Sequence, residues 1–234
     1  MFLFVFLAIL TSGLYARSGD QGVRQVRKVK EFSGISVNIP ADVVVKQGPV
    51  TEVVLEGPEH FLEKVETVVE GGVLRLRFYR KYSGHHAPEG RIRVEITVPE
   101  MERVYVTGSA TVKAAMSLSV SGAFRTVVTG SGSVEIDRLR AEKVRMSVTG
   151  SGSIRIAGAE VEEAEVMITG SGRIRAEGLP ARTAKVNITG SGDAWVQAEE
   201  DLKVMITGSG NLHYRGSAVV DARITGSGKL IRMD

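Results

Sequence analysis

The sequence predicts an all-β protein, a right-handed parallel β-helix or solenoid with coils of about 20 residues and an irregular β segment capping its N-terminal end. The first observation behind this prediction is a repeat, since Thr-Gly-Ser-Gly recurs at intervals of 20 or 18 residues. The second is a strict alternation of apolar and polar residues around each copy. The third is an imperfect copy, Thr107 to Ala110, before the first full one. The six full copies begin at Thr129, Thr149, Thr169, Thr189, Thr207 and Thr225.

The alternation around each copy has a period of two, which is typical of strands with one buried face. With the exception of Thr126, the residues one, three and five positions before each Thr, and five positions after it, are apolar. Charged or polar residues such as Arg145 and Lys185 fill the positions between them. We therefore expect Ile168 to point into the core and Met167 to point outward. The column expected just before the corners is Val148, Ile168, Ile188 and Ile206.

The Gly-Ser-Gly of each repeat is predicted to form the corner between two strands of one coil. Both glycines fall on the buried side of the alternation, where a residue without a side chain lets the backbone turn inward or take a positive φ. The Thr and Ser hydroxyls then point outward and line up from coil to coil. The rest of each period, for example residues 137–142, is expected to return the chain to the start of the next coil. Stacking such coils in parallel places neighbouring strands about 4.8 Å apart.

Residues 32–100 are also β in character but lack the repeat. Alternating runs at 32–39, 42–46, 52–56 and 91–98 predict strands, and Pro58 to Glu63 suits a single helical turn. Gly71-Gly72 lies between two apolar runs and predicts a hairpin. Because a solenoid must hide its first open edge, we expect this segment to cap the stack or to form its first coils.

The domain organisation follows from these boundaries. Residues 1–16 have the apolar run and small residues of a secretory signal peptide, although no basic residue precedes the run. Residues 17–31 are predicted to be a mobile polar lead-in, residues 32–100 the N-terminal β segment with the first coils, and residues 101–234 the repeat β-helix. An uncleaved anchor or a wrongly assigned start is the alternative for residues 1–16. We expect an exported protein, located in the periplasm, at the outer membrane or on the cell surface.

Composition excludes several classes of function. The 234 residues carry a net charge of +3 and contain no Cys, so disulfides, thiolate metal sites and Cys nucleophiles are excluded. Basic residues are interleaved with acidic ones and aromatic residues are few, which argues against nucleic acid as a partner. The mature chain has no apolar run long enough to span a membrane.

The chain resembles a bacterial family of unknown function described as putative autotransporter adhesin, head GIN domain. The resemblance covers about residues 32–230. It is carried by Phe32-x-x-Ile35-x-Val37, by Val94-x-Ile96-x-Val98-Pro99 and by the repeated corners in register. It implies an exported all-β protein with a right-handed β-helix.

No arrangement of residues in the sequence predicts an active site, so we expect no enzyme, no cofactor and no metal. His85-His86 could contribute to a metal site, but a solvated loop tip is the simpler interpretation. The acidic clusters at 160–163 and 199–201 fall between coils, where charges are usually solvated. Asp193 has no acidic counterpart in the other coils.

Trp195, Arg175 and His213 are the candidate binding residues. All three occupy the same outward position of successive repeats, and an exposed Trp among polar groups can stack on a sugar ring. Packing under a loop or against another subunit is the alternative. We expect a non-catalytic structural or adhesive module of the cell envelope, whose partner is a surface glycan or an envelope protein. A homo-oligomer through the C-terminal edge would be a further partner.

Two other functions stay open at this point. A carbohydrate-binding or carbohydrate-active β-helix protein is the main alternative. The outward hydroxyl ranks also resemble those of ice-binding solenoids, although a corner is more curved than ice matching requires.

Overall fold

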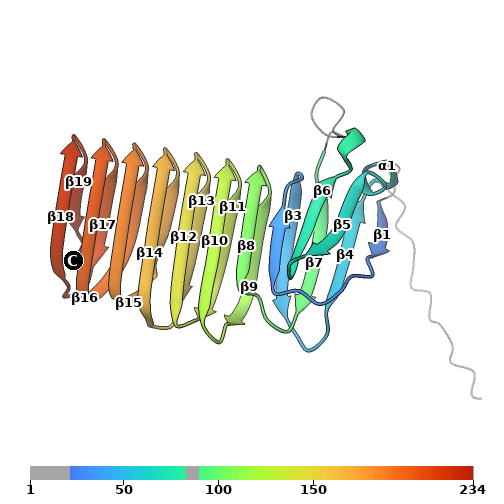
Figure 1. Ribbon diagram of the computed structural model, residues 1–234, viewed down its shortest axis with the longest axis horizontal. Helices are drawn as coiled ribbons and strands as arrows, with labels where there is room; N and C mark the ends of the chain where they lie inside the picture. Colours follow the sequence, from blue (N-terminus) through green and yellow to red (C-terminus); the bar gives the residue numbers. More distant parts are fainter. Residues whose placement is uncertain (1–21, 83–89, 234) are drawn as a thin grey trace, which may run out of the picture.

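The protein is a β-solenoid of about six regular turns (Figure 1). The computed structural model describes residues 22–82 and 90–233. The predicted signal peptide, residues 1–16, and the His85-His86 pair lie outside these residues. Strands run across the long axis of the molecule, and the repeat region occupies the half that ends at the C-terminus.

Each turn contributes one strand to each of two sheets, which face each other across the core. We call these the first and the second sheet. The first sheet has the order β5 (Val65–Glu70), β6 (Val73–Phe78), β2 (Gly34–Val37), β8 (Arg103–Gly108), β10 (Ala123–Gly130), β12 (Lys143–Gly150), β14 (Val161–Gly170), the second halves of β15 (Arg173–Gly190) and β16 (Asp193–Gly208), and β18 (Val219–Gly226).

The second sheet runs beside the first along the whole molecule. Strands β15 and β16 pass through both sheets, since each continues around the corner opposite the Gly-Ser-Gly corners. The second sheet has the order β1 (Val23–Val26), β4 (Glu52–Gly57), β7 (Ile92–Val98), β3 (Ala41–Gln47), β9 (Thr111–Ser119), β11 (Ser133–Arg140), β13 (Ser153–Gly158), the first halves of β15 and β16, β17 (Asn211–Arg215) and β19 (Lys229–Arg232).

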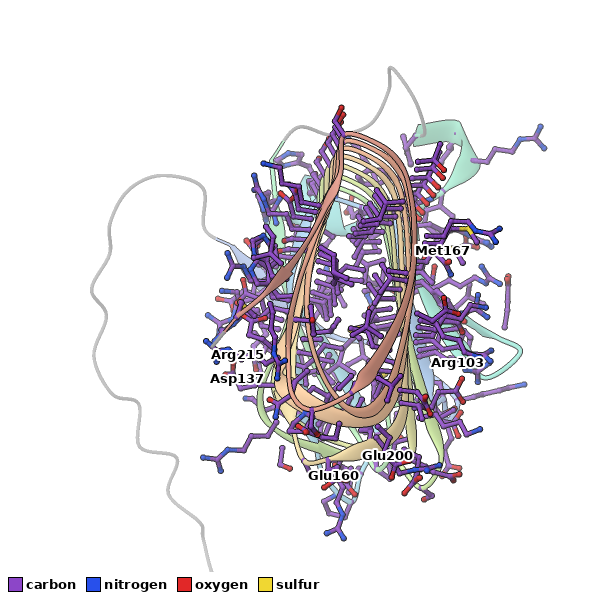
Figure 2. All side chains as sticks on the ribbon, turned by 90° about the vertical axis from the view of Figure 1, so that its left-hand side faces the viewer. Arg103, Asp137, Glu160, Met167, Glu200 and Arg215 are labelled. Carbon is purple, nitrogen blue, oxygen red and sulfur yellow. The ribbon has the colours of Figure 1, made fainter. Side chains whose placement is uncertain are left out.

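The register aligns equivalent repeat positions, as the sequence predicted. Thr149 lies directly beside Thr169, and Ile168 lies beside Val148 and Ile188 in one buried column. Ile168 is 1% exposed whereas its neighbour Met167 is 43% exposed. Figure 2 shows Met167 pointing away from the core on one face, while Asp137 and Arg215 point away from the opposite face. The two-residue period therefore assigns the inside and the outside correctly.

The corners are confirmed, and each glycine has its own reason to be there. Gly170 has a φ of +113°, in the region that favours glycine. Gly172 is buried, and a Cβ there would meet the Val148 side chain and the carbonyl oxygen of Gly152. The outward Thr and Ser residues of the corners are exposed, as expected.

The return segments are more regular than the sequence suggested. Residues 137–142 were expected to be a connection, yet β11 continues to Arg140, and Leu139 and Ala141 are buried. The pairing register shifts between Ile136 and Leu139. Beyond this shift the alternation of inward and outward side chains is offset by one residue, so that Leu139 and Ala141 point inward. The core therefore extends into the corner opposite the glycines.

The N-terminal segment both caps the stack and forms its first coils. The hairpin at Gly71-Gly72 joins β5 to β6, and the helical turn is α1 (Glu59–Leu62), followed after β6 by a short 3-10 helix at Arg80–Tyr82. Phe61 and Leu62 are completely buried beneath the cap. Within the predicted lead-in, residues 17–31, strand β1 pairs antiparallel with β4, which the sequence did not predict.

The order of the first coils differs from the order of the chain. The coil made by β2 and β3 lies between the coil of β6 and β7 and the coil of β8 and β9. The link between β7 and β8, residues 99–102, therefore passes over one coil. Glu102 and Arg103 anchor this link, since their backbone N–H groups both donate to the Ser33 carbonyl oxygen.

Candidate functional site

The three candidate binding residues come together on the outer face of the second sheet. Strand β15 supplies Arg175, β16 supplies Trp195 and β17 supplies His213, and the register places each directly beside the next. The sequence placed them at the same position of successive repeats, and the parallel register brings them side by side. We call these three residues the aromatic stack.

The stack is tight on both sides of the indole. The Arg175 guanidinium carbon lies 4.3 Å from the centre of the Trp195 ring. The His213 ring lies on the other side, 4.9 Å between centroids and 7° from parallel. Cation–π attraction and offset stacking both stabilise such an arrangement.

This geometry changes what the site can bind. A sugar stacks on the open face of an aromatic ring, but both faces of Trp195 are covered. What remains available to a ligand is the edge of the indole, the guanidinium and the imidazole. Each of these groups has N–H groups that can donate hydrogen bonds. The stack is therefore suited to hydrogen bonding with hydroxyl or carboxylate groups at its edge.

Polar side chains flank the stack on both sides. Asp193 accepts hydrogen bonds from the Asn211 amide side chain at 2.9 Å and from its backbone N–H at 3.2 Å. Arg175 lies 3.5 Å from a Glu177 carboxylate oxygen. Glu199 accepts hydrogen bonds from Gln197 and from Ser217, and these bonds lower the pKa of its carboxyl group. Carboxylates and amides thus lie on the same strands before and after the aromatic stack.

The acidic clusters at 160–163 and 199–201 are tied together by one arginine. Arg182 donates to Glu162 at 2.8 Å and to Glu200 at 2.7 Å, which links three successive coils. These carboxylates raise the pKa of Arg182. Glu160 and Glu200 lie at the lower end of the solenoid cross-section in Figure 2, which is the corner opposite the glycines. The clusters are therefore part of an ion-pair ladder between coils.

Among residues 22–82 and 90–233, no group of three His, Asp or Glu side chains is placed to hold a metal ion. No helix within these ranges has the length and apolar character needed to cross a membrane.

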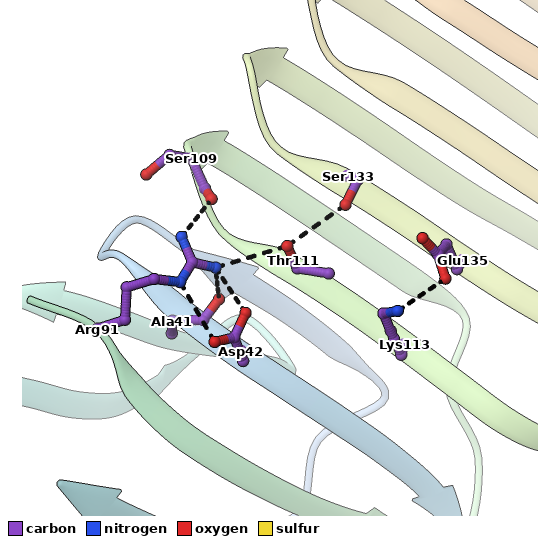
Figure 3. A network of polar contacts seen from close by, with 8 residues as sticks. All are labelled: Ala41, Asp42, Arg91, Ser109, Thr111, Lys113, Ser133 and Glu135. Atoms are coloured by element: carbon purple, nitrogen blue, oxygen red, sulfur yellow. Dashed lines mark hydrogen bonds and ion pairs between the residues drawn. The ribbon is translucent and has the colours of Figure 1, made fainter.

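A polar network that the sequence did not predict lies at the start of the corner column (Figure 3). Arg91 binds both carboxylate oxygens of Asp42, at 2.7 and 3.2 Å. It also donates to the carbonyl oxygens of Ala41 and Ser109, at 3.0 Å each. Arg91 thus joins three coils beside the imperfect corner, and only the nonsequential order of these coils brings its partners together.

Comparison with known proteins decides the family. Residues 31–218 match the family described as "Putative auto-transporter adhesin, head GIN domain". The chain belongs to this family. Comparison with curated proteins gives no match.

Solved structures share the fold over nearly their whole length. A putative adhesin from Bacteroides fragilis is 22% identical, with a TM-score of 0.85 over 92% of this chain and 98% of the other. A putative adhesin from Parabacteroides merdae is 21% identical, with a TM-score of 0.68 over 92% and 97%. A protein from Parabacteroides distasonis described as a putative lipid binding protein is 23% identical, with a TM-score of 0.71 over 92% and 97%. At these identities the likeness establishes the fold.

Proposed function

We propose that this GIN-domain protein is an exported, non-catalytic module of the cell envelope that presents an adhesive surface. The observation that supports this most is the family membership, together with a solenoid whose outward positions are aligned along two long faces. A rigid stack that repeats one coil offers the same kind of contact many times, which suits an extended partner. The apolar run of residues 2–10 supports export.

The surface around the aromatic stack is the part we assign to binding. It combines a guanidinium, an indole edge and an imidazole with the Asp193–Asn211 pair beside them. A surface glycan or an envelope protein with hydroxyl and carboxylate groups would meet hydrogen-bonding partners there. This assignment favours contact along the edge of the stack over stacking on the Trp195 ring.

The test is binding of the purified chain, from Arg17 onward, to a glycan array and to whole bacterial cells. The test variant is Trp195→Ala, and the matched control is Met205→Ala, which removes an exposed side chain from the first sheet. We expect binding by the wild type and the control, and at least about a fivefold weaker binding by the Trp195 variant. Equal binding by all three proteins would remove this surface from the proposal, and no binding to any cell or glycan would contradict the adhesive function.

The same experiment covers the carbohydrate-active alternative. If a glycan that binds is also cleaved, and one acidic substitution in a coil abolishes the cleavage, the protein is an enzyme and our proposal fails.

A further inference from the structure

The last coil within the described residues, made by β18 and β19, leaves part of the core uncovered. Strand β18 pairs with β16 along one edge, and no strand within the described residues pairs with its other edge. Ile224 belongs to the buried column of Ile188 and Ile206, yet it is 39% exposed. Ala222 is exposed as well, and Val220 is only partly buried. The last coil thus presents apolar side chains and a row of free backbone hydrogen-bonding groups.

The opposite end of the molecule shows how this fold closes such an edge. There, β5 pairs antiparallel with β6 in the first sheet, and β4 pairs antiparallel with β7 in the second, where β1 follows antiparallel to β4. Glu66 stands directly opposite Arg77 in that pairing, and the two form an ion pair of 2.6 Å. An antiparallel strand with an opposed acid and base therefore already closes one end of the stack.

Two copies of β18 can form the same arrangement with each other. Its central residues are Val220-Asp221-Ala222-Arg223-Ile224, with an acid and a base placed symmetrically about Ala222. If two copies of β18 pair antiparallel with Ala222 opposite Ala222, each Asp221 faces an Arg223 of the other copy. On the inner side, each Val220 then faces an Ile224. Opposite charges and apolar pairs placed directly across a strand pair both stabilise it.

We propose that two copies of the protein join end to end through β18, with a two-fold axis at Ala222. The interface extends the first sheet across both molecules and covers the exposed apolar residues of the last coil. Strand β19 carries Lys229 and Arg232 and no acid, so it supplies no matching pair, and β18 sets the register. Because β1, β4, β5 and α1 cap the other end, the assembly closes as a dimer and does not grow into a fibre.

The proposed dimer does not depend on the adhesive function, but dimerisation would change how the protein binds its partner. Two solenoids joined at their C-terminal ends carry two copies of the binding surface on one rigid body. A partner with repeated groups could engage both copies, which raises the overall affinity. The dimer is measured without any ligand, so the two proposals can fail separately.

Sedimentation of the chain from Arg17 onward tests the dimer, and charge reversal tests its register. In a dimer of the Arg223→Asp variant, both opposed pairs consist of two acids. In a dimer of the Asp221→Arg variant, both opposed pairs consist of two bases. Each variant alone should raise the dimer dissociation constant about tenfold. An equimolar mixture of the two variants restores both opposite-charge pairs, so it should form heterodimers with near wild-type affinity. A variant that only unfolds the last coil would not be rescued by mixing.

A cross-link provides a second readout, because the chain contains no Cys. Ala222→Cys places one thiol on each side of the two-fold axis, within reach of a disulfide. Thr129→Cys, at an exposed corner away from the C-terminal end, is the matched control. We expect oxidation to give covalent dimers of the Ala222 variant and none of the control. A wild-type chain that stays monomeric at about 100 μM, well above the dissociation constant that we expect of a specific interface, would overturn the proposal. So would a dimer that both charge reversals leave unchanged.

Discussion

Gly170 and Gly172 occupy one corner but are required for different reasons. At Gly170 the backbone has a positive φ, and a Cβ would lie 2.7 Å from the carbonyl oxygen of Gly150. At Gly172 the φ is ordinary for any residue, and the obstacle is the packing of the neighbouring coil. Ser171 between them is exposed, with its side chain free of the core. The repeated motif thus combines a conformational requirement with a steric one.

We expect Gly170→Val and Gly172→Val each to lower the free energy of unfolding by at least about 2 kcal/mol, through strain or displaced backbone. Ser171→Ala should change it by less than about 0.5 kcal/mol, because the side chain is on the surface. Urea denaturation of the three variants checks this. Wild-type stability in either valine variant would rule out the proposed role of the corner glycines.

The core column gives a second prediction at the scale of single residues. Ile168→Ala removes a side chain that is 1% exposed and should cost about 2–5 kcal/mol. Met167→Ala, which removes a side chain that is 43% exposed, should cost less than about 1 kcal/mol. Thermal unfolding of the pair compares adjacent residues on one strand, so equal losses would mean that the inside and the outside are wrongly assigned.

At the scale of elements, the repeat made some strands predictable and others not. Equivalent residues such as Val148 and Ile168 are neighbours because one coil follows another, so spacing alone predicts their contact. The place of β2 between β6 and β8 has no such signal, since its partners lie far along the chain in both cases. Strand β1 was missed because a four-residue edge strand with alternate polar residues resembles a polar lead-in.

The Asp42–Arg91 network links these nonsequential coils and should depend on pH. The hydrogen bond from Arg91, together with the positive charges of Arg91 and Lys113, lowers the pKa of Asp42 in the folded protein. An acid with a lowered folded pKa stabilises the fold above its unfolded pKa of about 3.9, and this contribution is lost as the pH falls through the folded value.

Asp42→Asn should therefore be less stable than the wild type near about pH 7, and the difference should shrink below about pH 4. Urea midpoints of both proteins across this range measure it. A difference that stays constant down to about pH 2 would show that the charge of Asp42 contributes nothing to stability.

At the scale of the whole molecule, the repetition of one coil explains the fold, but it limits how much of the candidate site can be predicted. A sequence that repeats one coil predicts parallel sheets, buried columns and aligned outward positions, including the row that contains Arg175, Trp195 and His213. It could not predict that both faces of Trp195 are covered, because that depends on side-chain conformations on the two neighbouring coils. It also gave no signal for the Arg91 network, whose partners come from coils stacked out of chain order.

We propose above all that this solenoid acts outside the cytoplasm by presenting a surface. Fractionation of the native cells, with an antibody against the chain, is the direct test of this proposal. We expect the protein in the periplasmic, outer-membrane or surface fraction, with residues 1–16 removed as a signal peptide. Recovery of the full-length chain in the cytoplasmic fraction would contradict the claim.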